Sequence, residues 1–208
     1  WVETADGRSL SARAVVVTVP VMVLRDSVTF VPALPGPVRA AIDGFLSGIY
    51  EHAVLHWPSS PFRGADRLAS IVGGRHKPPG LLSRIDGTPF HYFELDAPAA
   101  GEVDARGGGE DGVRRFARAV LAEHFGHARL RDLTIPAVSA WRHDPWSRGS
   151  WAVVPPGHAG ARAFLRAPVG DRLWFAGEAL SRLQWGTVGG AYEEGTRAAD
   201  AIASGLRA

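Results

Sequence analysis

Residues 172–191 read RLWFAGEALSRLQWGTVGGA, and this stretch decides the fold of the C-terminal region. The apolar run at 172–176 predicts a short strand that leads directly into Gly177 and Glu178. Apolar residues at helical spacing over 187–206 predict a helix after the loop. A strand, loop and helix in this order place free N–H groups and a positive dipole end at a sheet edge, where an anion is favoured. The alternative is a glycine-rich turn that serves close packing only.

The N-terminal region predicts extended chain and one helix. Residues 1–19 are expected to form a hairpin, because a turn at 5–8 (ADGR) separates a short strand from the β-branched run ARAVVVTV at 12–19. Residues 27–35 (SVTFVPALP) are punctuated by proline and are expected to be extended. Residues 37–45 carry a proline followed by apolar side chains at helical spacing, which indicates a helix.

The middle of the chain predicts an antiparallel sheet. Short apolar or alternating segments, separated by turns rich in glycine and proline, are expected to be its strands at 49–57, 68–72 and 90–95. A further strand is expected at 134–141. Residues 113–125 show helical spacing. Residues 97–112 (APAAGEVDARGGGEDG) are polar and glycine-rich, so we expect a surface loop with three solvated carboxylates, Asp104, Glu110 and Asp111.

Composition narrows the class of protein. The 208 residues are 46% hydrophobic and 21% charged, as in folded globular chains, and carry a net charge of +2. A basic stripe of the kind that binds nucleic acid is absent from the sequence, and so is an apolar run long enough to span a membrane. Because there is no cysteine, thiolate metal sites are excluded, and the eight histidines lack H-E-x-x-H spacing, so we expect no metal. With no secretory pattern at residue 1, we expect a cytoplasmic protein.

Several motifs occur in a fixed order along the chain. They are VVVTVPVMVLRDSVTFVPALP at 15–35, WRHDPWSRGSW at 141–151, PPG at 155–157, PVGDRLWFAGEA at 168–179 and GTVGGAYEEGTRAA at 186–199. Together they resemble the C-terminal half of the flavin-dependent amine oxidases, the family of monoamine, polyamine and L-amino-acid oxidases. The resemblance covers nearly the whole chain.

The resemblance implies a chain of the α+β/α/β class. It comprises an antiparallel-sheet substrate domain and the C-terminal strand and helix of an FAD-binding Rossmann-like domain whose N-terminal half is missing. Residues 1–20 would be a strand hairpin of the FAD domain, 21–150 the substrate-binding domain and 151–208 the C-terminal part of the FAD domain. The family's G-x-G-x-x-G motif for the pyrophosphate should follow a first strand, but the glycines at 107–109 follow no strand and those at 186–190 form a different element. We therefore expect the chain to act with an N-terminal FAD-binding half or subunit and to be inactive alone.

The resemblance also implies a cofactor site for FAD. Glu178 matches the acidic residue that faces the ribityl and pyrophosphate region. Thr187 and Val188 match the helix start whose N–H groups approach the flavin pyrimidine carbonyl and stabilise negative charge on the ring. Gly177 and Gly186 complete the cofactor-binding set. For Thr187 a simple N-cap role is the competing interpretation.

Three residues are implied in catalysis, namely His52, Trp151 and Thr187. Trp151 matches an aromatic wall beside the flavin, and the second wall would need Trp185 or Tyr192, because the matching position is Thr187. His52 falls at or next to the family's lysine that holds a water against flavin N5, and the sole lysine, Lys77, lies elsewhere. The competing interpretations are a core aromatic for Trp151 and a solvent-facing strand residue for His52.

The function implied is FAD-dependent oxidation of a C–N bond in a small-molecule amine or amino acid. A flavin desaturase or protoporphyrinogen-type oxidase that acts on C–C bonds is one alternative. A non-catalytic fragment that pairs with an FAD-binding chain is another, because both the lysine and the dinucleotide motif are missing from their expected places.

Overall fold

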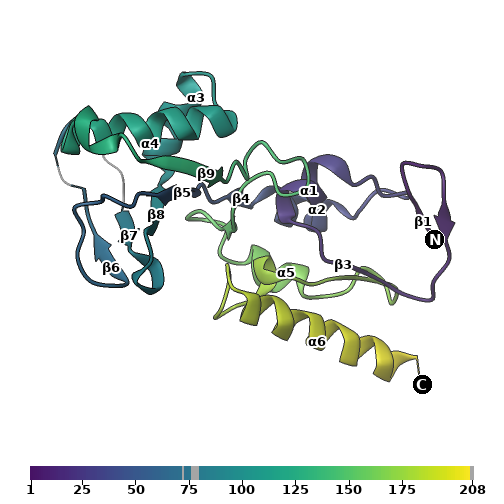
Figure 1. The fold of residues 1–208 in the computed structure, drawn as a ribbon. Coiled ribbons are helices and arrows are strands. Elements are labelled where there is room, and N and C mark those ends of the chain that lie inside the picture. Colours follow the sequence, from purple (N-terminus) through teal and green to yellow (C-terminus); the bar gives the residue numbers. More distant parts are fainter. Residues whose placement is uncertain (72, 76–79, 207–208) are drawn as a thin grey trace. The chain divides into compact units, whose positions relative to one another are not determined.

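The computed structural model describes residues 1–71, 73–75 and 80–206, and the chain folds into two compact units (Figure 1). The split unit comprises Trp1–Ser47 and Trp151–Ala208, and the central unit comprises Gly48–Ser150. Residues 21–47 thus belong with the N- and C-terminal segments, whereas the sequence analysis groups them with the middle of the chain. Which unit serves cofactor and which serves substrate stays a prediction.

The central unit contains a five-stranded antiparallel sheet in the order β6-β7-β8-β5-β9. The strands are β5 (Glu51–His56), β6 (Arg67–Ala69), β7 (Gly80–Ser83), β8 (Phe90–Leu95) and β9 (Thr134–Val138). The predicted antiparallel sheet is therefore confirmed. The strand β7 was not predicted, and Val72 and Lys77, which the sequence analysis assigns to a strand end and a loop, lie outside the described residues.

Helices cover one face of this sheet (Figure 1). They are α3 (Ala97–Ala105) and α4 (Gly109–Phe125), with the short 3-10 turns η1 (Ile85–Gly87) and η2 (His127–Leu130) at the edges. The predicted surface loop at 97–112 is wrong. Asp96 caps α3 by accepting a hydrogen bond from the Ala99 N–H at 3.1 Å, and the small residues of α3 are buried against the sheet. The sequence analysis missed this helix because most residues at 97–112 are polar or glycine, and the apolar stripe of α3 is narrow. The stripe consists of Ala99, Ala100 and Val103.

Alternation along the strands separates a buried face from a half-exposed face. In β5 the side chains of Glu51, Ala53 and Leu55 are buried beneath the helices, whereas those between them are partly exposed. Trp57, directly after β5, is fully buried, and its indole N–H donates to the Arg129 carbonyl of η2 at 2.9 Å. A sheet with one covered face leaves the other free to contact a ligand or another part of the protein.

The split unit is built from short elements around a second core. It contains β1 (Val2–Glu3), β2 (Ser9–Leu10), β3 (Val15–Val17), α1 (Val21–Ser27), α2 (Gly36–Asp43) and β4 (Leu46–Ser47) from the first segment. The second segment adds β10 (Ala152–Val153), α5 (Ala161–Leu165), β11 (Leu173–Phe175), η3 (Glu178–Leu180) and α6 (Val188–Gly205). The predicted helices at 37–45 and 187–206 correspond to α2 and α6.

The predicted N-terminal hairpin needs a correction. β1 pairs with β2 across the turn, but the β-branched run does not join that hairpin. Instead β3 pairs in parallel with β11, with Val15 opposite Leu173 and Val17 opposite Phe175. A run of β-branched residues fits this parallel position as well as it fits a hairpin, so composition cannot identify the partner strand. No helix in the described part of the chain has the length and hydropathy of a membrane span.

The buried His91 predicts a dependence of stability on acid. Its ring is fully buried, burial lowers its pKa, and Nδ1 accepts the Arg84 N–H at 3.2 Å. Because the unfolded chain binds a proton near pH 6.5 that the folded chain resists, the free energy of unfolding should fall as pH drops below that value. We expect His91→Gln, which keeps an acceptor but cannot titrate, to reduce the loss between neutral pH and pH 5 by on the order of 1 kcal/mol in urea titrations. An unchanged pH dependence would contradict this role.

Candidate functional site

The predicted site residues fall in both units, which are described separately. The split unit holds Trp151, Gly177, Glu178, Gly186, Thr187 and Val188. The central unit holds His52. Within the split unit, the loop between β11 and α6 brings most of the predicted cofactor residues together.

Glu178 fastens three segments of the split unit. Its Oε1 accepts a hydrogen bond from the Ala152 N–H of β10 at 2.9 Å, and its Oε2 accepts one from the Gly186 N–H at 2.7 Å. An ionised carboxylate that accepts backbone N–H groups makes stronger hydrogen bonds than a neutral acceptor does. Both Glu178 oxygens are therefore used to hold the loop in place.

Gly186 brings the loop against Trp151. Its φ of +72° lies in the left-handed region, and a Cβ at this position would stand 3.3 Å from the Trp151 Cγ. Only glycine combines that backbone conformation with so close an approach. The Trp151 side chain is 39% exposed, so one part of it packs on the loop and another part remains accessible.

Thr187 is the N-cap of α6. Its hydroxyl accepts the Gly190 N–H at 3.0 Å and donates to the Gln184 carbonyl at 2.7 Å. Thr187 therefore has the N-cap geometry that the competing interpretation expects. This geometry does not prevent a ligand from binding at the start of the helix. The earliest N–H groups of a helix lack intrahelical partners, and the Val188 side chain beside them is 88% exposed. This helix start is available to an anionic group.

Arg162 of α5 was not predicted as part of this region. Its guanidinium lies 5.5 Å from the Phe45 ring centroid and 5.2 Å from that of Trp185, and it donates to the carbonyls of Ala179 and Ala152. Burial lowers its pKa, and the nearby Glu178 carboxylate acts in the opposite direction. One arginine among many offers no signal in sequence, because its partners come from distant segments.

Trp185 and Tyr192 are the candidates for a second aromatic wall. Trp185 rests against the Arg162 guanidinium and is 51% exposed, so one face is held by a cation–π contact. Tyr192 lies on α6 and is more exposed still. Trp185 is therefore the better-ordered of the two.

A buried ion network holds α6 to the rest of the split unit. Glu194 is 4% exposed and pairs with Arg197 at 2.7 Å and Arg166 at 3.2 Å. Arg197 also donates to the Phe175 carbonyl of β11 at 2.9 Å. Removal of one partner from such a network leaves a buried charge uncompensated, so these residues fix the helix position.

His52 lies on the half-exposed face of the central sheet. Its ring centroid is 4.5 Å from that of Tyr50 and 4.4 Å from that of Tyr92. Burial lowers its pKa, whereas the Glu94 and Glu51 carboxylates act to raise it. The predicted solvent-facing alternative is thus incomplete, because two aromatic rings orient the imidazole.

Behind His52, Glu51 anchors the segment that begins the WRHDPWSRGSW motif. The buried carboxylate accepts hydrogen bonds from the Ser139 hydroxyl at 2.6 Å and from the N–H groups of Trp141 and Arg142 at 3.1 and 3.2 Å. The Ser139 hydroxyl in turn accepts the His52 N–H at 2.8 Å. The motif and the strand that carries His52 are therefore joined through one carboxylate.

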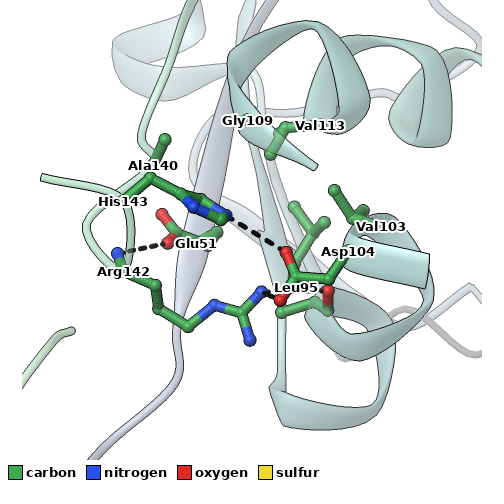
Figure 2. A pocket seen from close by; sticks show the side chains of 10 residues that line it. Glu51, Leu95, Val103, Asp104, Gly109, Val113, Ala140, Arg142 and His143 are labelled. Carbon is green, nitrogen blue, oxygen red and sulfur yellow. Dashed lines mark hydrogen bonds and ion pairs between the residues drawn. The ribbon is translucent and has the colours of Figure 1, made fainter. Parts of the chain in front are cut away.

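Figure 2 shows Asp104 next to this anchor, which corrects its assignment to a solvated loop. Asp104 belongs to α3 and pairs with the Arg142 guanidinium and with His143 at 3.2 Å. Glu110 and Asp111 lie in the first turn of α4, where negative charge favours the helix. The cavity beside these residues measures about 10 Å³, the lower limit for one water molecule, so it is not a substrate site.

Histidines at 124 and 127 do not gather into a metal site. The His124 ring nitrogens lie 2.8 Å from the Val120 carbonyl and 2.9 Å from the Gly73 carbonyl. Among the described residues, no cluster of three or more histidine, aspartate or glutamate side chains has the arrangement to hold a metal ion.

Comparison with known proteins identifies the family of this chain. The profile described as flavin containing amine oxidoreductase matches residues 1–203. The chain belongs to this family. The predicted resemblance is therefore confirmed over nearly the whole sequence.

The relatives include proteins named polyamine oxidase and proteins named lysine-specific histone demethylase. Polyamine oxidase 4 of Oryza sativa is 34% identical over 209 residues, which cover 96% of this chain and 41% of that protein. Lysine-specific histone demethylase 2 of Homo sapiens is 31% identical over 220 residues, covering 98% and 26% respectively. Polyamine oxidase 2 of Arabidopsis thaliana is 31% identical, covering 96% and 40%. The chain thus spans between about a quarter and two-fifths of these relatives.

Gly190 is the position in this site least tolerant of a side chain. A Cβ there would stand 2.1 Å from the Gln184 carbonyl oxygen, which belongs to the backbone of the loop between β11 and α6. We expect Gly190→Ala to lower the free energy of unfolding by about 3 kcal/mol or more in denaturant titrations, because backbone must move. Gly195→Ala is the matched control in the same helix. Nothing lies within 4 Å of its Cβ position, so it should be neutral or stabilising by up to about 1 kcal/mol.

Replacement of Glu178 by glutamine tests the anchoring role of its carboxylate. The amide group keeps one acceptor oxygen but turns an NH₂ group toward a backbone N–H, so one of the two hydrogen bonds is lost. We expect Glu178→Gln to cost about 1–2 kcal/mol of unfolding free energy. The exposed Glu193, which accepts from the Gln184 side chain at 2.9 Å, supplies the control, since Glu193→Gln should change stability by less than about 0.5 kcal/mol. Equal effects of the two substitutions would rule out the anchoring role.

Proposed function

We propose that this chain is the C-terminal part of an FAD-dependent amine oxidase that oxidises a C–N bond of a small-molecule amine or amino acid. The split unit would contribute the flavin-ring end of the cofactor site, and the central unit would bind substrate. Membership of the family and the accessible, capped start of α6 support this proposal. The names of the relatives, polyamine oxidases and lysine-specific histone demethylases, agree with an amine substrate.

The residues of the split unit fit the ring end of a flavin. The start of α6 offers N–H groups and a positive dipole end, and Gly186 keeps the approach to it clear of side chains. Glu178 accepts the N–H groups of Ala152 and Gly186, and Arg162 lies over the ring of Trp185, so the loop before α6 is held in place before a ligand arrives. Preorganised donors of this kind stabilise negative charge without a reorganisation cost.

A flavin supplies the acceptor for the hydride equivalent of the amine when it is bound. The chain's own residues would bind the flavin and the amine, orient them toward each other and exclude water from them. Trp151 and Trp185 offer partly exposed indole faces that would exclude water beside the flavin ring. Thr187 keeps α6 from fraying at the end that faces the ligand.

The N-terminal part of the FAD site is proposed to come from a further segment or subunit. The only G-x-G-x-x-G spacing in the sequence, GGGEDG at 107–112, comes after α3, runs into the start of α4 and follows no strand, so the pyrophosphate needs another binding element. The parallel pair β3–β11 has few strands for a dinucleotide fold, and additional parallel strands would complete such a sheet. We also propose that the active protein is cytoplasmic.

His52 lies at or next to the position where the family resemblance expects lysine. Because burial lowers its pKa, the imidazole is neutral near pH 7 and supplies less positive charge than an ammonium group. We therefore expect slower reaction of the reduced enzyme with oxygen than in members that carry the lysine.

Anaerobic reduction of the cofactor tests the proposed function. The chain is produced together with the polypeptide encoded directly upstream, purified, and its visible absorption recorded while amines and amino acids are added without oxygen. We expect the absorption bands of bound oxidised flavin, and we expect one class of amine to bleach them. Flavin that binds but is not bleached by amines would favour the C–C oxidoreductase alternative. A purified complex without flavin would favour a non-catalytic fragment.

A further inference from the structure

Four side chains gather on the half-exposed face of the central sheet. Tyr50 directly precedes β5, His52 lies in β5, and Tyr92 and Glu94 come from β8. The strands are antiparallel, with His52 directly opposite Glu94. Because alternate residues share a face, all four side chains lie on the side away from α3 and α4. None of them belongs to the buried core.

The rings in this cluster are packed against one another. The Tyr50 ring meets the His52 ring edge-on at 4.5 Å with an interplanar angle of 87°, and the Tyr92 ring lies at 4.4 Å with an angle of 33°. In the described part of the chain neither ring nitrogen of His52 has a hydrogen-bond partner. An oriented imidazole with unused nitrogens on a half-exposed face is well placed to contact a ligand.

The charge of the cluster is negative. Burial and hydrogen bonding with Glu94 raise the pKa of Tyr50, and burial lowers that of His52, so both are neutral near pH 7. Ion pairs in the described part of the central unit use other carboxylates, namely Glu102, Asp104, Glu110 and Glu123. Glu94 therefore contributes a negative charge that no described cation offsets by an ion pair.

All of these groups prefer the same kind of ligand. A carboxylate attracts a cation, the faces of tyrosine rings attract a cation, and a neutral imidazole nitrogen accepts a hydrogen bond from an N–H donor. An ammonium group combines positive charge with N–H donors. We propose that Tyr50, His52, Tyr92 and Glu94 form a binding site for the alkylammonium group of an amine ligand.

This inference deepens the proposed function, on which it rests for the identity of the ligand as the substrate. The ammonium group bound here is not the nitrogen that is oxidised, because a protonated amine has no lone pair to support loss of a hydride equivalent. It assigns Glu94 a role in specificity that sequence motifs do not indicate. A lysine at residue 52 would place its own ammonium group beside Glu94 and fill the site. The exchange of lysine for histidine therefore changes what this face can bind as well as the charge it presents.

A ligand that cannot be oxidised separates binding from catalysis. tert-Butylammonium has no hydrogen on the carbon next to nitrogen, and tert-butanol is its neutral counterpart of similar shape. Binding of each is measured by calorimetry with the purified complex of this chain and the upstream polypeptide. We expect tert-butylammonium to bind more tightly than tert-butanol. Glu94→Gln should raise the dissociation constant of tert-butylammonium about tenfold and leave that of tert-butanol unchanged.

Three further variants protect the test against misfolding. Glu110→Gln removes one negative charge from the helix layer, where Glu110 pairs with Arg114 at 2.9 Å, and should not alter ammonium binding. His52→Lys should abolish tert-butylammonium binding, because the variant supplies its own cation, while Tyr92→Leu should weaken it several-fold by removal of one ring face. Circular dichroism of each variant reports whether the fold is retained.

The outcomes distinguish this inference from the proposed function. If Glu94→Gln and Glu110→Gln have equal effects on tert-butylammonium, or if the ammonium binds no better than the alcohol, the assigned site is wrong even when amines bleach the flavin. If the site binds ammonium as expected but no amine bleaches the flavin, the site stands and the proposed oxidation fails.

Discussion

The hydrogen bonds accepted by the Glu178 carboxylate are the constraint on which the candidate cofactor region depends. One side chain holds the N–H of Ala152 and the N–H of Gly186, and thereby ties β10, the end of β11 and the loop before α6 together. This loop includes Gln184, whose carbonyl accepts a hydrogen bond from the Thr187 hydroxyl. The N-terminus of α6 is thus positioned by a carboxylate that precedes it by several residues.

The same principle operates in the central unit with a different carboxylate. Glu51 is buried and binds the segment that follows β9, where the tryptophan-rich motif begins. In both units an acidic side chain satisfies backbone N–H groups of an irregular loop, a task that regular secondary structure performs elsewhere. Irregular loops that carry functional residues need such support, because their own backbone bonds are few.

The relation of the two faces of the central sheet explains how one strand serves both stability and recognition. Glu51 points toward the helices and anchors the chain, whereas His52, the next residue, points to the opposite face and meets two tyrosines. A change of one residue in strand register would exchange these roles. The packing of Ala53 and Leu55 in the core therefore also fixes the orientation of His52.

Periodicity predicted much of the fold where it was strong. The helix at 187–206 and the strand at 90–95 agree closely with α6 and β8, because their apolar spacing is regular. The segment at 97–112 misled because glycine and charge dominate its composition, although three small residues are enough to bury α3. The run at 12–19 was recognised as a strand, but its partner lies far away in sequence at β11.

The sequence by itself determined the family, because ordered motifs are a property of the linear chain. It also determined which residues stand at the expected cofactor positions, Glu178 and Thr187 among them. The tertiary structure alone decided what those side chains touch. It placed Arg162 between two aromatic rings, and it set Glu94 opposite His52. The physical reason is that such contacts join residues distant in sequence, whose meeting depends on strand register and packing rather than on any local pattern.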